Sequence, residues 1–377
     1  MSAWPGKYVI GLTGNIATGK SVVRKMLEHL GAYGIDADAL GHRAIAKGAP
    51  GYRPVVEMFG KWILSPDGQI DRGRLGKVVF ADPAALAQLE AIVHPLVRQA
   101  VDVLVKRSAH PVIVIEAIKL LEGPLRRACD AIFVSYSTEK QQVTRLVEKR
   151  GLSEEAARQR IAAQPPQEEK TAAADIIIRN DGSFEDTWRQ VMAAWQVLFP
   201  TATAPQPAPA PVSKDELMIE RARPKEASEI ATFITQITAR QRAMSHDDVM
   251  AAFGEKAYLL VRKNARLVGL VGWQVENLVA RTDDVYLDPH LPLSTTMKKI
   301  MEEVERTSRD LQCEASLLFL YPSLARQEEV WRMLGYEARN VHSLGVRAWQ
   351  EAAQESMPKG TVMYFKQLRK DRVLRPV

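Results

Sequence analysis

Cysteine is scarce in this sequence: Cys129 and Cys313 are the two cysteines among 377 residues. They lie far apart and show no paired spacing, which argues against a disulfide framework and against a thiolate metal site. So low a number fits a reducing compartment. We expect both thiols to be buried and to serve as small apolar side chains.

Long apolar runs are missing as well. No window approaches the run of about 18 apolar residues that a membrane helix requires, and residues 1–5 lack the charged-then-apolar layout of a secretory signal. We therefore expect a cytoplasmic protein without a membrane partner. The apolar fraction of 46% supports globular folding, and a chain of this length can form two hydrophobic cores.

A strong excess of one charge is also lacking. The formal net charge is +6, but 45 acidic residues are interspersed with the 51 basic ones, so the balance is a weak sign of polyanionic ligands. We interpret the basic C-terminal tail as a solvated terminus in preference to a nucleic-acid or acidic-lipid contact, and we expect no nucleic-acid partner. The tail contains Lys366, Arg369, Lys370, Arg372 and Arg375.

Proline and alanine are concentrated in one stretch. Residues 200–214 read PTATAPQPAPAPVSK, which has no apolar periodicity and favours an extended spacer. We therefore predict a first domain over residues 1–199, a linker over 200–215 and a second domain over 216–377. In the first domain, short apolar runs alternate with helix-period segments, which predicts an α/β fold with a parallel sheet wrapped by helices. The runs are Tyr8–Leu12, Val112–Ile115, Ala131–Val134 and Ile176–Ile178.

A phosphate-binding loop is the strongest signal in the sequence. Gly14 is followed by four residues and then by Gly19, Lys20 and Ser21, between an apolar strand and an amphipathic helix. Glycines let backbone N–H groups point at phosphate oxygens, a lysine neutralises the terminal phosphates, and a hydroxyl ligates Mg²⁺. We expect ATP and Mg²⁺ here, with Lys20 as a catalytic cation and Ser21 as the metal ligand. The expected ATP-binding residues of the loop are Gly14, Asn15, Ile16, Ala17, Thr18, Gly19, Lys20, Ser21 and Val22.

Two carboxylates follow in the segment AYGIDADALGHR. We expect Asp36 and Asp38 at the end of a short strand beside the loop, where such sheets bind ligands. A carboxylate there can accept a proton from an attacking hydroxyl or hold Mg²⁺ through water. The alternative role for this pair is N-capping of the next helix.

At these residues the chain resembles the dephospho-coenzyme A kinases. The resemblance spans roughly residues 7–199 and includes the loop, IDAD, GAPGYRPVVEMFG, DGQIDRGRLGKVVFADP, LEAIVHPLV, LSEEAARQRIAAQ and AADIIIRNDGS in the same order. It implies a three-layer α/β/α P-loop NTPase fold with a lid. It also implies transfer of the ATP γ-phosphoryl group to the ribose 3′-hydroxyl of dephospho-CoA, the last step of coenzyme A biosynthesis.

The resemblance also assigns roles to single residues. Asp38 is the implied general base, and Asp36, His94 and Glu116 are the implied substrate contacts, although His94 can equally be a packed structural histidine. The region from Leu40 to His110 would bind the acceptor. Arg145 matches a catalytic lid position in Gln141–Thr171, which reads as two helices, whereas Arg158 and Arg160 fit an exposed surface. Asn180 matches a position near the adenine.

The sequence departs from the family pattern at three places. Asn15 and Ala17 replace glycines, and Ala17 narrows the allowed backbone. The stretch after the third strand reads EAIKLLEG, with Ile118 and Lys119 where the family has proline and leucine. The second lid arginine falls on Lys149, with Arg150 one place later, so either cation can be the one that meets phosphate.

The second domain resembles the GNAT family of N-acetyltransferases. The segment from Leu217 alternates strands and helices: YLLVRKNARLVGLVGWQV reads as two strands across an Arg-Leu turn, and VWRMLGYEAR resembles the late helix and strand of that family. The resemblance implies a mixed α/β fold and a ligand such as CoA or acetyl-CoA. The family's glycine-rich pyrophosphate loop is replaced by DPHLPLSTTMKK, where Ser294–Thr296 can still hold an anion. We interpret Tyr321 as a core residue in preference to an acid.

Two alternatives to dephospho-CoA kinase activity remain open. One is another small-molecule or nucleoside monophosphate kinase, because the loop and the lid are shared by such enzymes. The other is a CoA-sensing protein that binds without chemistry. Lys20, Ser21 and Asp38 favour chemistry over sensing.

Overall fold

A computed structural model describes residues 3–200, 217–371 and 373–374. Almost all of the predicted linker therefore lies outside the described residues, as do Arg372 and Arg375 of the basic tail, and the predicted domain boundary stays a prediction. The chain divides into two compact units. The first unit comprises Met1–Lys20, Tyr33–Ile177 and Asp371–Val377, and the second comprises Ser21–Ala32 and Ile178–Lys370.

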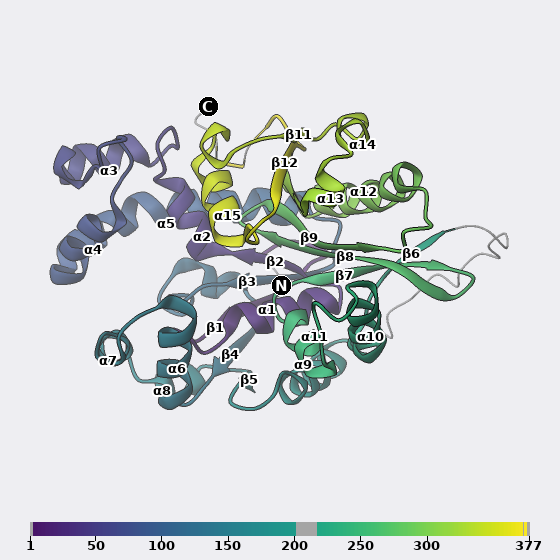
Figure 1. Cartoon of the computed structure of the whole chain (residues 1–377). Coiled ribbons are helices and arrows are strands. Elements are labelled where there is room, and N and C mark those ends of the chain that lie inside the picture. Colours follow the sequence, from purple (N-terminus) through teal and green to yellow (C-terminus); the bar gives the residue numbers. More distant parts are fainter. Residues whose placement is uncertain (1–2, 201–216, 372, 375–377) are drawn as a thin grey trace. The chain divides into compact units, whose positions relative to one another are not determined.

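A five-stranded sheet with the order β2-β3-β1-β4-β5 organises the N-terminal half of the chain (Figure 1). Strand β1 pairs in parallel with β3 and with β4, and β2 pairs in parallel with β3. All four strands that the apolar runs predict are present, so the α/β prediction is confirmed. The strands are β1 (Tyr8–Thr13), β2 (Tyr33–Asp36), β3 (Val112–Glu116), β4 (Ala131–Tyr136) and β5 (Ile176–Arg179).

The carboxyl ends of three strands meet at one edge of this sheet. Glu116, the last residue of β3, lies opposite Leu12 of β1 and opposite Asp36 of β2. The residues of β3 are all buried, as expected for a parallel strand covered on both faces. Polar side chains that follow these buried runs are therefore brought together at the edge where such sheets bind ligands.

The predicted acceptor region, Leu40–His110, is helical. Helix α2 (Ala37–Ala44) packs along α5 (Pro83–Arg107), and the smaller elements share an apolar cluster that includes Val55, Ile63 and Leu75. These smaller elements are α3 (Tyr52–Phe59), the 3₁₀ turn η1 (Lys61–Ile63) and α4 (Arg72–Ala81).

The lid segment differs from its prediction. It forms three helices where we predicted two: α6 (Glu139–Arg150), α7 (Glu154–Ala162) and α8 (Gln167–Ala172). Gly151, in the left-handed conformation with φ 63°, ends α6. Prolines 165 and 166 then separate α7 from α8, because a proline disfavours helical backbone in the residue before it.

A seven-stranded sheet with the order β11-β12-β10-β9-β8-β7-β6 organises the second unit. Strand β10 is parallel to β9, and the other pairings with a recorded register are antiparallel, so the sheet is mixed as predicted. The strands are β6 (Met218–Arg221), β7 (Ala257–Lys263), β8 (Arg266–Glu276), β9 (Val279–Leu287), β10 (Ala315–Leu320), β11 (Glu337–Ala338) and β12 (Val362–Gln367).

The hairpin between β7 and β8 corrects the predicted Arg-Leu turn. The turn residues are Asn264 and Ala265, with φ 52° and 63°, and Arg266 pairs with Lys263. Two consecutive positive φ angles are typical of the type I′ turn, which matches the twist of the flanking strands and which asparagine tolerates well.

Helices cover both faces of the second sheet. Alternate residues of β7 enter different cores: Leu259 and Val261 pack with α12, whereas Tyr258 and Leu260 pack with α10 and α11. The helices of this unit include α9 (Phe184–Leu198), α10 (Ala227–Ile237), α11 (His246–Phe253), α12 (Leu293–Asp310), α13 (Pro322–Ala325), α14 (Glu328–Met333) and α15 (Arg347–Ser356). Within the described residues no helix has the length and apolar character needed to cross a membrane.

Candidate active site

The loop after β1 has a backbone that glycine alone accommodates. Gly14 has φ 151°, and a Cβ there would lie 2.4 Å from the carbonyl oxygen of Ser135. The Ser135 hydroxyl donates to the carbonyl oxygen of Thr18 at 2.8 Å, which fixes the loop to β4. The main chain at Gly14 can therefore approach β4 closely only because the residue has no side chain.

Ala17 occupies a left-handed position in the same loop. Its φ is 59°, a conformation that costs a non-glycine residue about 1–2 kcal/mol. Its side chain packs against the apolar cluster of α6 and α7, which includes Leu146 and Ala157. The left-handed backbone agrees with the expectation that Ala17 narrows the allowed backbone, and packing against the lid helices offsets part of its cost.

Lys20 begins α1 (Lys20–His29) and is 8% exposed. Its ammonium group donates to the carbonyl oxygens of Gly14 and Asn15, each at 3.2 Å. Burial lowers the pKa of Lys20, while the charges of Glu116 and Asp38 act to raise it. A buried ammonium ion that rests on loop carbonyls in this way is ready to neutralise a phosphate.

The two aspartates after β2 have different partners. Asp36 is the N-cap of α2, and its carboxylate accepts from the backbone N–H of Ala39 at 2.8 Å. Asp38 lies two residues further on, and its Oδ2 accepts from the backbone N–H of Ile118 at 3.0 Å. Asp36 therefore performs the capping, which leaves the Asp38 carboxylate directed at the segment after β3.

Burial raises the pKa of Asp38. The hydrogen bond from Ile118 and the charges of Lys20 and Lys170 act in the opposite direction, while Glu116 adds to the rise. Glu116 is 4% exposed at the end of β3. These side chains form one cluster at the carboxyl edge of the sheet, with Asp38 as its half-buried carboxylate.

The lid contacts the loop through Arg145. Its Nη1 donates to the carbonyl oxygen of Ala17 at 3.1 Å and to the Ser137 hydroxyl at 3.2 Å. The charge of Arg150 acts on Lys20 and lowers the pKa of that lysine. Arg158 is exposed and pairs with Glu154 and Glu139, as expected for a surface arginine.

Sequence reasoning missed a segment that joins the lid to the loop. Gln164 accepts from the backbone N–H of Ile16 at 2.7 Å, and the Asn15 amide donates to the carbonyl oxygen of Pro165 at 2.8 Å. Further along the chain, Lys170 of α8 is 4% exposed and donates to the carbonyl oxygen of Ile118 at 2.7 Å. Nothing in QEEKTA distinguishes this lysine from a solvated one, because α8 is short and polar.

Four predicted site residues lie outside the contacts described so far. His94 is half-buried on α5, the helix that packs against α2. Asn180 is 6% exposed in the turn before α9, where its side-chain oxygen accepts from the Thr187 hydroxyl at 3.1 Å. Ser21 and Val22 are the second and third residues of α1. Ligand contacts for these four residues stay predictions.

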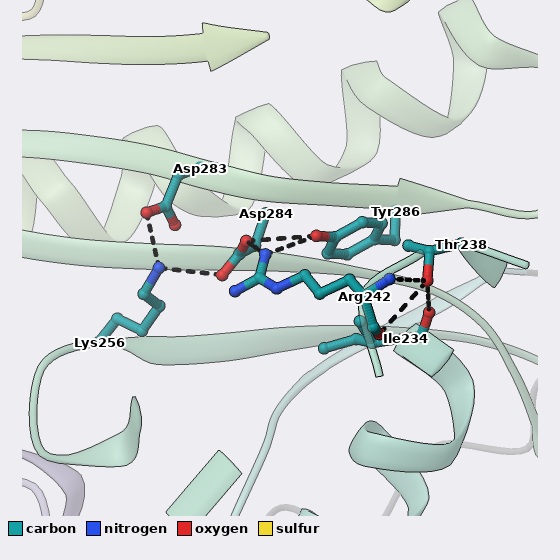
Figure 2. A network of polar contacts seen from close by, with 7 residues as sticks. All are labelled: Ile234, Thr238, Arg242, Lys256, Asp283, Asp284 and Tyr286. Carbon is teal, nitrogen blue, oxygen red and sulfur yellow. Dashed lines mark hydrogen bonds and ion pairs between the residues drawn. The ribbon is translucent and has the colours of Figure 1, made fainter. Parts of the chain in front are cut away.

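The second unit contains a buried network of charges (Figure 2). Lys256 bridges two adjacent carboxylates on β9, with its ammonium 2.6 Å from Asp283 and 2.9 Å from Asp284. Arg242, from the segment between α10 and α11, reaches Asp284 and the hydroxyl of Tyr286. The network ties that segment to the sheet.

The pKa values of the two carboxyls in this network are shifted in opposite directions. Burial raises the pKa of Asp283. For Asp284 burial acts in the same sense, but the charges of Lys256 and Arg242 outweigh it and hold the pKa of that carboxyl below its ordinary value. Both residues are 9% exposed, so Lys256 is the counter-ion that lets them remain buried.

Strands β9 and β10 pair over only part of their lengths. The recorded pairing runs from Val279–Ala315 to Thr282–Leu318, yet β9 continues to Leu287 and β10 to Leu320. Asp284, just beyond the last pair, has φ 47°. The strands thus lose their hydrogen bonding at the end of the sheet from which the chain enters α12.

Tyr321 corrects a prediction. It is 44% exposed at the end of β10 and is not a core residue. Thr296, in the first turn of α12, is fully buried, and its hydroxyl has no hydrogen-bond partner among the described residues, whereas Ser294 and Thr295 are exposed. Two of the three hydroxyl residues predicted to hold an anion are therefore accessible.

Comparison with known proteins places the N-terminal half. The family described as dephospho-CoA kinase matches residues 8–186. A dephospho-CoA kinase of Geobacter sulfurreducens is 43% identical over 195 residues, which are 51% of this chain and 99% of that protein. One from Geobacter metallireducens is 44% identical over 191 residues, covering 50% of this chain and 95% of the relative. The chain belongs to the dephospho-CoA kinase family.

Solved structures of a second family also align with part of this dephospho-CoA kinase family member. An acetyltransferase of the GNAT family from Staphylococcus aureus aligns with 41% of this chain and 100% of its own, at 14% identity and a TM-score of 0.34. The family membership predicted from the loop, IDAD and the later motifs is confirmed. The functional role of each site residue stays a prediction.

Proposed function

We propose that this protein transfers the γ-phosphoryl group of ATP to the ribose 3′-hydroxyl of dephospho-CoA, giving CoA and ADP. One observation carries the proposal. The buried ammonium ion of Lys20 and the carboxylate of Asp38 belong to a single cluster at the carboxyl edge of the sheet, in a chain of the dephospho-CoA kinase family. A cation for phosphate and a base for a hydroxyl are the groups that phosphoryl transfer requires.

The proposed reaction divides the work among few residues. Backbone N–H groups of the loop and the Lys20 ammonium bind the ATP phosphates and stabilise the charge that develops during transfer. Asp38 accepts the proton of the 3′-hydroxyl as its oxygen attacks the γ-phosphorus, and ADP leaves. Arg145, which already contacts the Ala17 carbonyl, adds positive charge from the lid.

Magnesium fits the same site. Within the described residues no group of three or more His, Cys, Asp or Glu side chains is arranged to hold a metal, so its ligands would be phosphate oxygens and the Ser21 hydroxyl at the start of α1. Lys20 is buried, and the side-chain oxygen of Asn15 is also buried and has no hydrogen-bond partner in the described part of the chain, so the loop is a polar site suited to a metal-bound phosphate. When bound, Mg²⁺ neutralises the β- and γ-phosphate oxygens.

The proposed setting is the cytoplasm. Cys129 and Cys313 are the two cysteines of the sequence and lie far apart in it, which fits a reducing compartment. A biosynthetic kinase would meet ATP there.

The experiment measures ADP formation by the purified full chain with Mg-ATP and either dephospho-CoA or a panel of nucleoside monophosphates. Selective turnover of dephospho-CoA supports the proposal. Turnover of a nucleoside monophosphate instead would identify another kinase. Stabilisation by CoA in a thermal-shift assay, without any Mg²⁺-dependent loss of ATP, would identify a sensor.

We also propose that the second unit binds CoA or acetyl-CoA. The observation that favours it is the separation of β9 from β10 beyond Thr282 and Leu318, next to a helix N-terminus whose N-cap, Pro292, provides no side-chain hydrogen bond. Backbone N–H groups at such a terminus suit a phosphate.

Calorimetry tests this second site. The kinase site also binds CoA as product, so the full chain should bind two CoA molecules. A Ser294→Glu substitution should remove one of the two by placing a negative charge where phosphate binds, whereas Glu329→Gln, a change on the exposed surface of α14, should keep both. A single CoA site in the unsubstituted chain would refute the proposal.

A further inference from the structure

A buried lysine in the lid segment contacts the segment that holds Asp38. Lys170 lies on α8 and is 4% exposed, although the other residues of this short helix are mostly exposed. Its ammonium group donates to the carbonyl oxygen of Ile118 at 2.7 Å. Burying an ammonium ion is costly unless it is paired and hydrogen-bonded, so this placement demands a compensating interaction.

Ile118 is held on both sides of its backbone. Its carbonyl oxygen accepts from Lys170 and also from the Thr13 hydroxyl at 3.0 Å, while its N–H donates to Oδ2 of Asp38 at 3.0 Å. The preceding residue, Ala117, continues the sheet through a 3.0 Å hydrogen bond to the carbonyl oxygen of Leu12. The orientation of the Ile118 N–H, and with it the Asp38 carboxylate, depends on the two donors to that carbonyl.

Lys170 also belongs to the electrostatic surroundings of Asp38. The charged groups that act on Asp38 include Lys20 from α1, Glu116 from β3 and Lys170 from α8. Burial lowers the pKa of Lys170, while Glu122 and Asp38 act to raise it and Lys20 acts to lower it further. The single carboxylate pair of Asp38 and Glu116 is thus matched by two lysines, one of which comes from the lid.

The same lid segment touches the phosphate loop. Gln164 accepts from the Ile16 N–H, and the Pro165 carbonyl accepts from the Asn15 amide. Residues 164–170 therefore connect the loop, which would hold ATP, to the segment that orients Asp38.

We propose that Lys170 is a positioning residue for the phosphoryl transfer: it fixes the Ile118 peptide that orients Asp38, and its ammonium ion stabilises the Asp38 carboxylate. The inference rests on the proposed function, because it assigns Lys170 to the base of that reaction. In this proposal Lys170 acts through Asp38 and Ile118 and does not contact the substrate.

Three substitutions test the charge of Lys170 and the hydrogen bonds to the Ile118 carbonyl. Lys170→Met removes both while keeping the length of the side chain, and Lys170→Arg keeps a cation. Thr13→Val removes the other donor to the Ile118 carbonyl without changing any charge. The measurement is the pH dependence of kcat and of kcat/KM for dephospho-CoA in the full chain, together with KM for ATP.

The acidic limb of the kcat/KM profile reports the protonation of Asp38 in the free enzyme. Without the Lys170 charge, the carboxylate is less stable, so its pKa rises and the limb of Lys170→Met should move upward by about one pH unit. We expect kcat above the limb to fall by about tenfold or more, since the loss of oriented geometry lowers the rate. KM for ATP should change little. Lys170→Arg should return the limb to its original position, and Thr13→Val should lower kcat without moving the limb.

Opposite results would overturn the inference. A limb in the same place for Lys170→Met and the unsubstituted chain, or a limb in Lys170→Arg displaced as far as in Lys170→Met, would show that Lys170 has only a structural role. An inactive unsubstituted chain would refute the proposed kinase reaction instead.

An activity-independent titration keeps the electrostatic part testable. The ¹³C carboxyl resonance of Asp38, assigned by Asp38→Asn, can be titrated in the labelled full chain and in Lys170→Met. An upward shift of the Asp38 pKa in the variant supports the inference, and identical titrations refute it. Should Lys170→Met fail to fold, Lys170→Gln provides the same loss of charge with a shorter, polar side chain.

Discussion

The backbone N–H of Ile118 donates a hydrogen bond of 3.0 Å to Oδ2 of Asp38. The sequence pattern of the dephospho-CoA kinase family has a proline at this position, and a proline has no N–H to donate. The departure in EAIKLLEG therefore supplies Asp38 with a partner through the main chain. The replacement of proline by isoleucine therefore affects Asp38 through the backbone N–H of residue 118, and not through the isoleucine side chain.

Replacing Asp38 should stop turnover and spare ATP. Asp38→Asn retains an oxygen that can accept from Ile118 N–H but cannot take up a proton, so kcat should fall at least about 10²-fold while ATP affinity stays nearly unchanged. Lys20→Ala should damage both, because it removes the buried cation at the loop. Steady-state kinetics and ATP titration measure the two effects. Turnover by Asp38→Asn at the rate of the unsubstituted chain would remove Asp38 as the base.

The second lid cation should be Arg150. The charge of Arg150 acts on Lys20, so we expect Arg150, rather than its neighbour Lys149, to be the lid cation nearer the phosphates. Arg150→Ala should therefore lower kcat by about tenfold or more, as expected for loss of a charge that stabilises the transition state, and the neighbouring Lys149→Ala should change it less than about twofold. The two variants are matched in position and in the charge removed. The reverse order of effects would assign the contact to Lys149.

Gly272 should be intolerant of a side chain. A Cβ there would lie 2.6 Å from Oδ1 of Asp283 and 3.1 Å from the Cβ of Asp284, so Gly272→Ala must displace the buried carboxylates. We expect a loss of about 2 kcal/mol in the free energy of unfolding. Gly345→Ala is the control, because among the described residues no atom beyond Gly345 and its two chain neighbours lies within 4 Å of its Cβ position. Denaturant unfolding that gives equal stabilities for the two variants would contradict this reasoning.

Removing Lys256 should destabilise the second unit and reverse its response to acid. Lys256→Met leaves Asp283 and Asp284 buried without their shared cation, at a cost of about 3 kcal/mol in the free energy of unfolding. The pKa of both carboxyls in the folded variant should then lie above the unfolded value, so the folded state binds protons more tightly.

Unfolding experiments at several pH values check the sign. The stability deficit of Lys256→Met should be largest at neutral pH and should shrink as the pH falls through the raised folded pKa of these carboxyls. Adding Asp283→Asn to Lys256→Met should recover part of the loss at neutral pH. A deficit that is constant between pH 4 and 8, a window of about four units chosen to span an elevated carboxyl pKa, would exclude the charge explanation.

Both thiols should react slowly in the native protein. Burial raises the pKa of the Cys129 thiol to about 12, so little reactive thiolate forms at neutral pH, and Cys313 is fully buried. A thiol-specific reagent should label both cysteines readily in denaturant and hardly at all without it. Rapid native labelling of Cys129 would show that the thiol is more accessible than its surroundings indicate.

Local sequence patterns were sufficient to predict much of the fold. The four strands of the first sheet that contain apolar runs were predictable, because a short apolar run bounded by turn residues is typical of a strand in a parallel sheet. The phosphate loop was predictable because the glycine positions at Gly14 and Gly19 follow from backbone geometry alone. The lid was predicted less well, because its division into three helices depends on Gly151 and on two consecutive prolines, Pro165 and Pro166.

The sequence by itself determined the α/β class, the phosphate loop that contains Lys20 and the place of Asp38 directly after β2, because these follow from the spacing of residues within short segments. Only the tertiary structure decided which partners these groups have. The roles of Lys170, Ile118 and Lys256 depend on segments that are distant in the chain, and a lysine that is buried against a carbonyl or between two carboxylates has the same local sequence signature as one in solvent. Burial and partner choice are properties of the assembled fold, since they arise from packing between elements rather than from propensity within one.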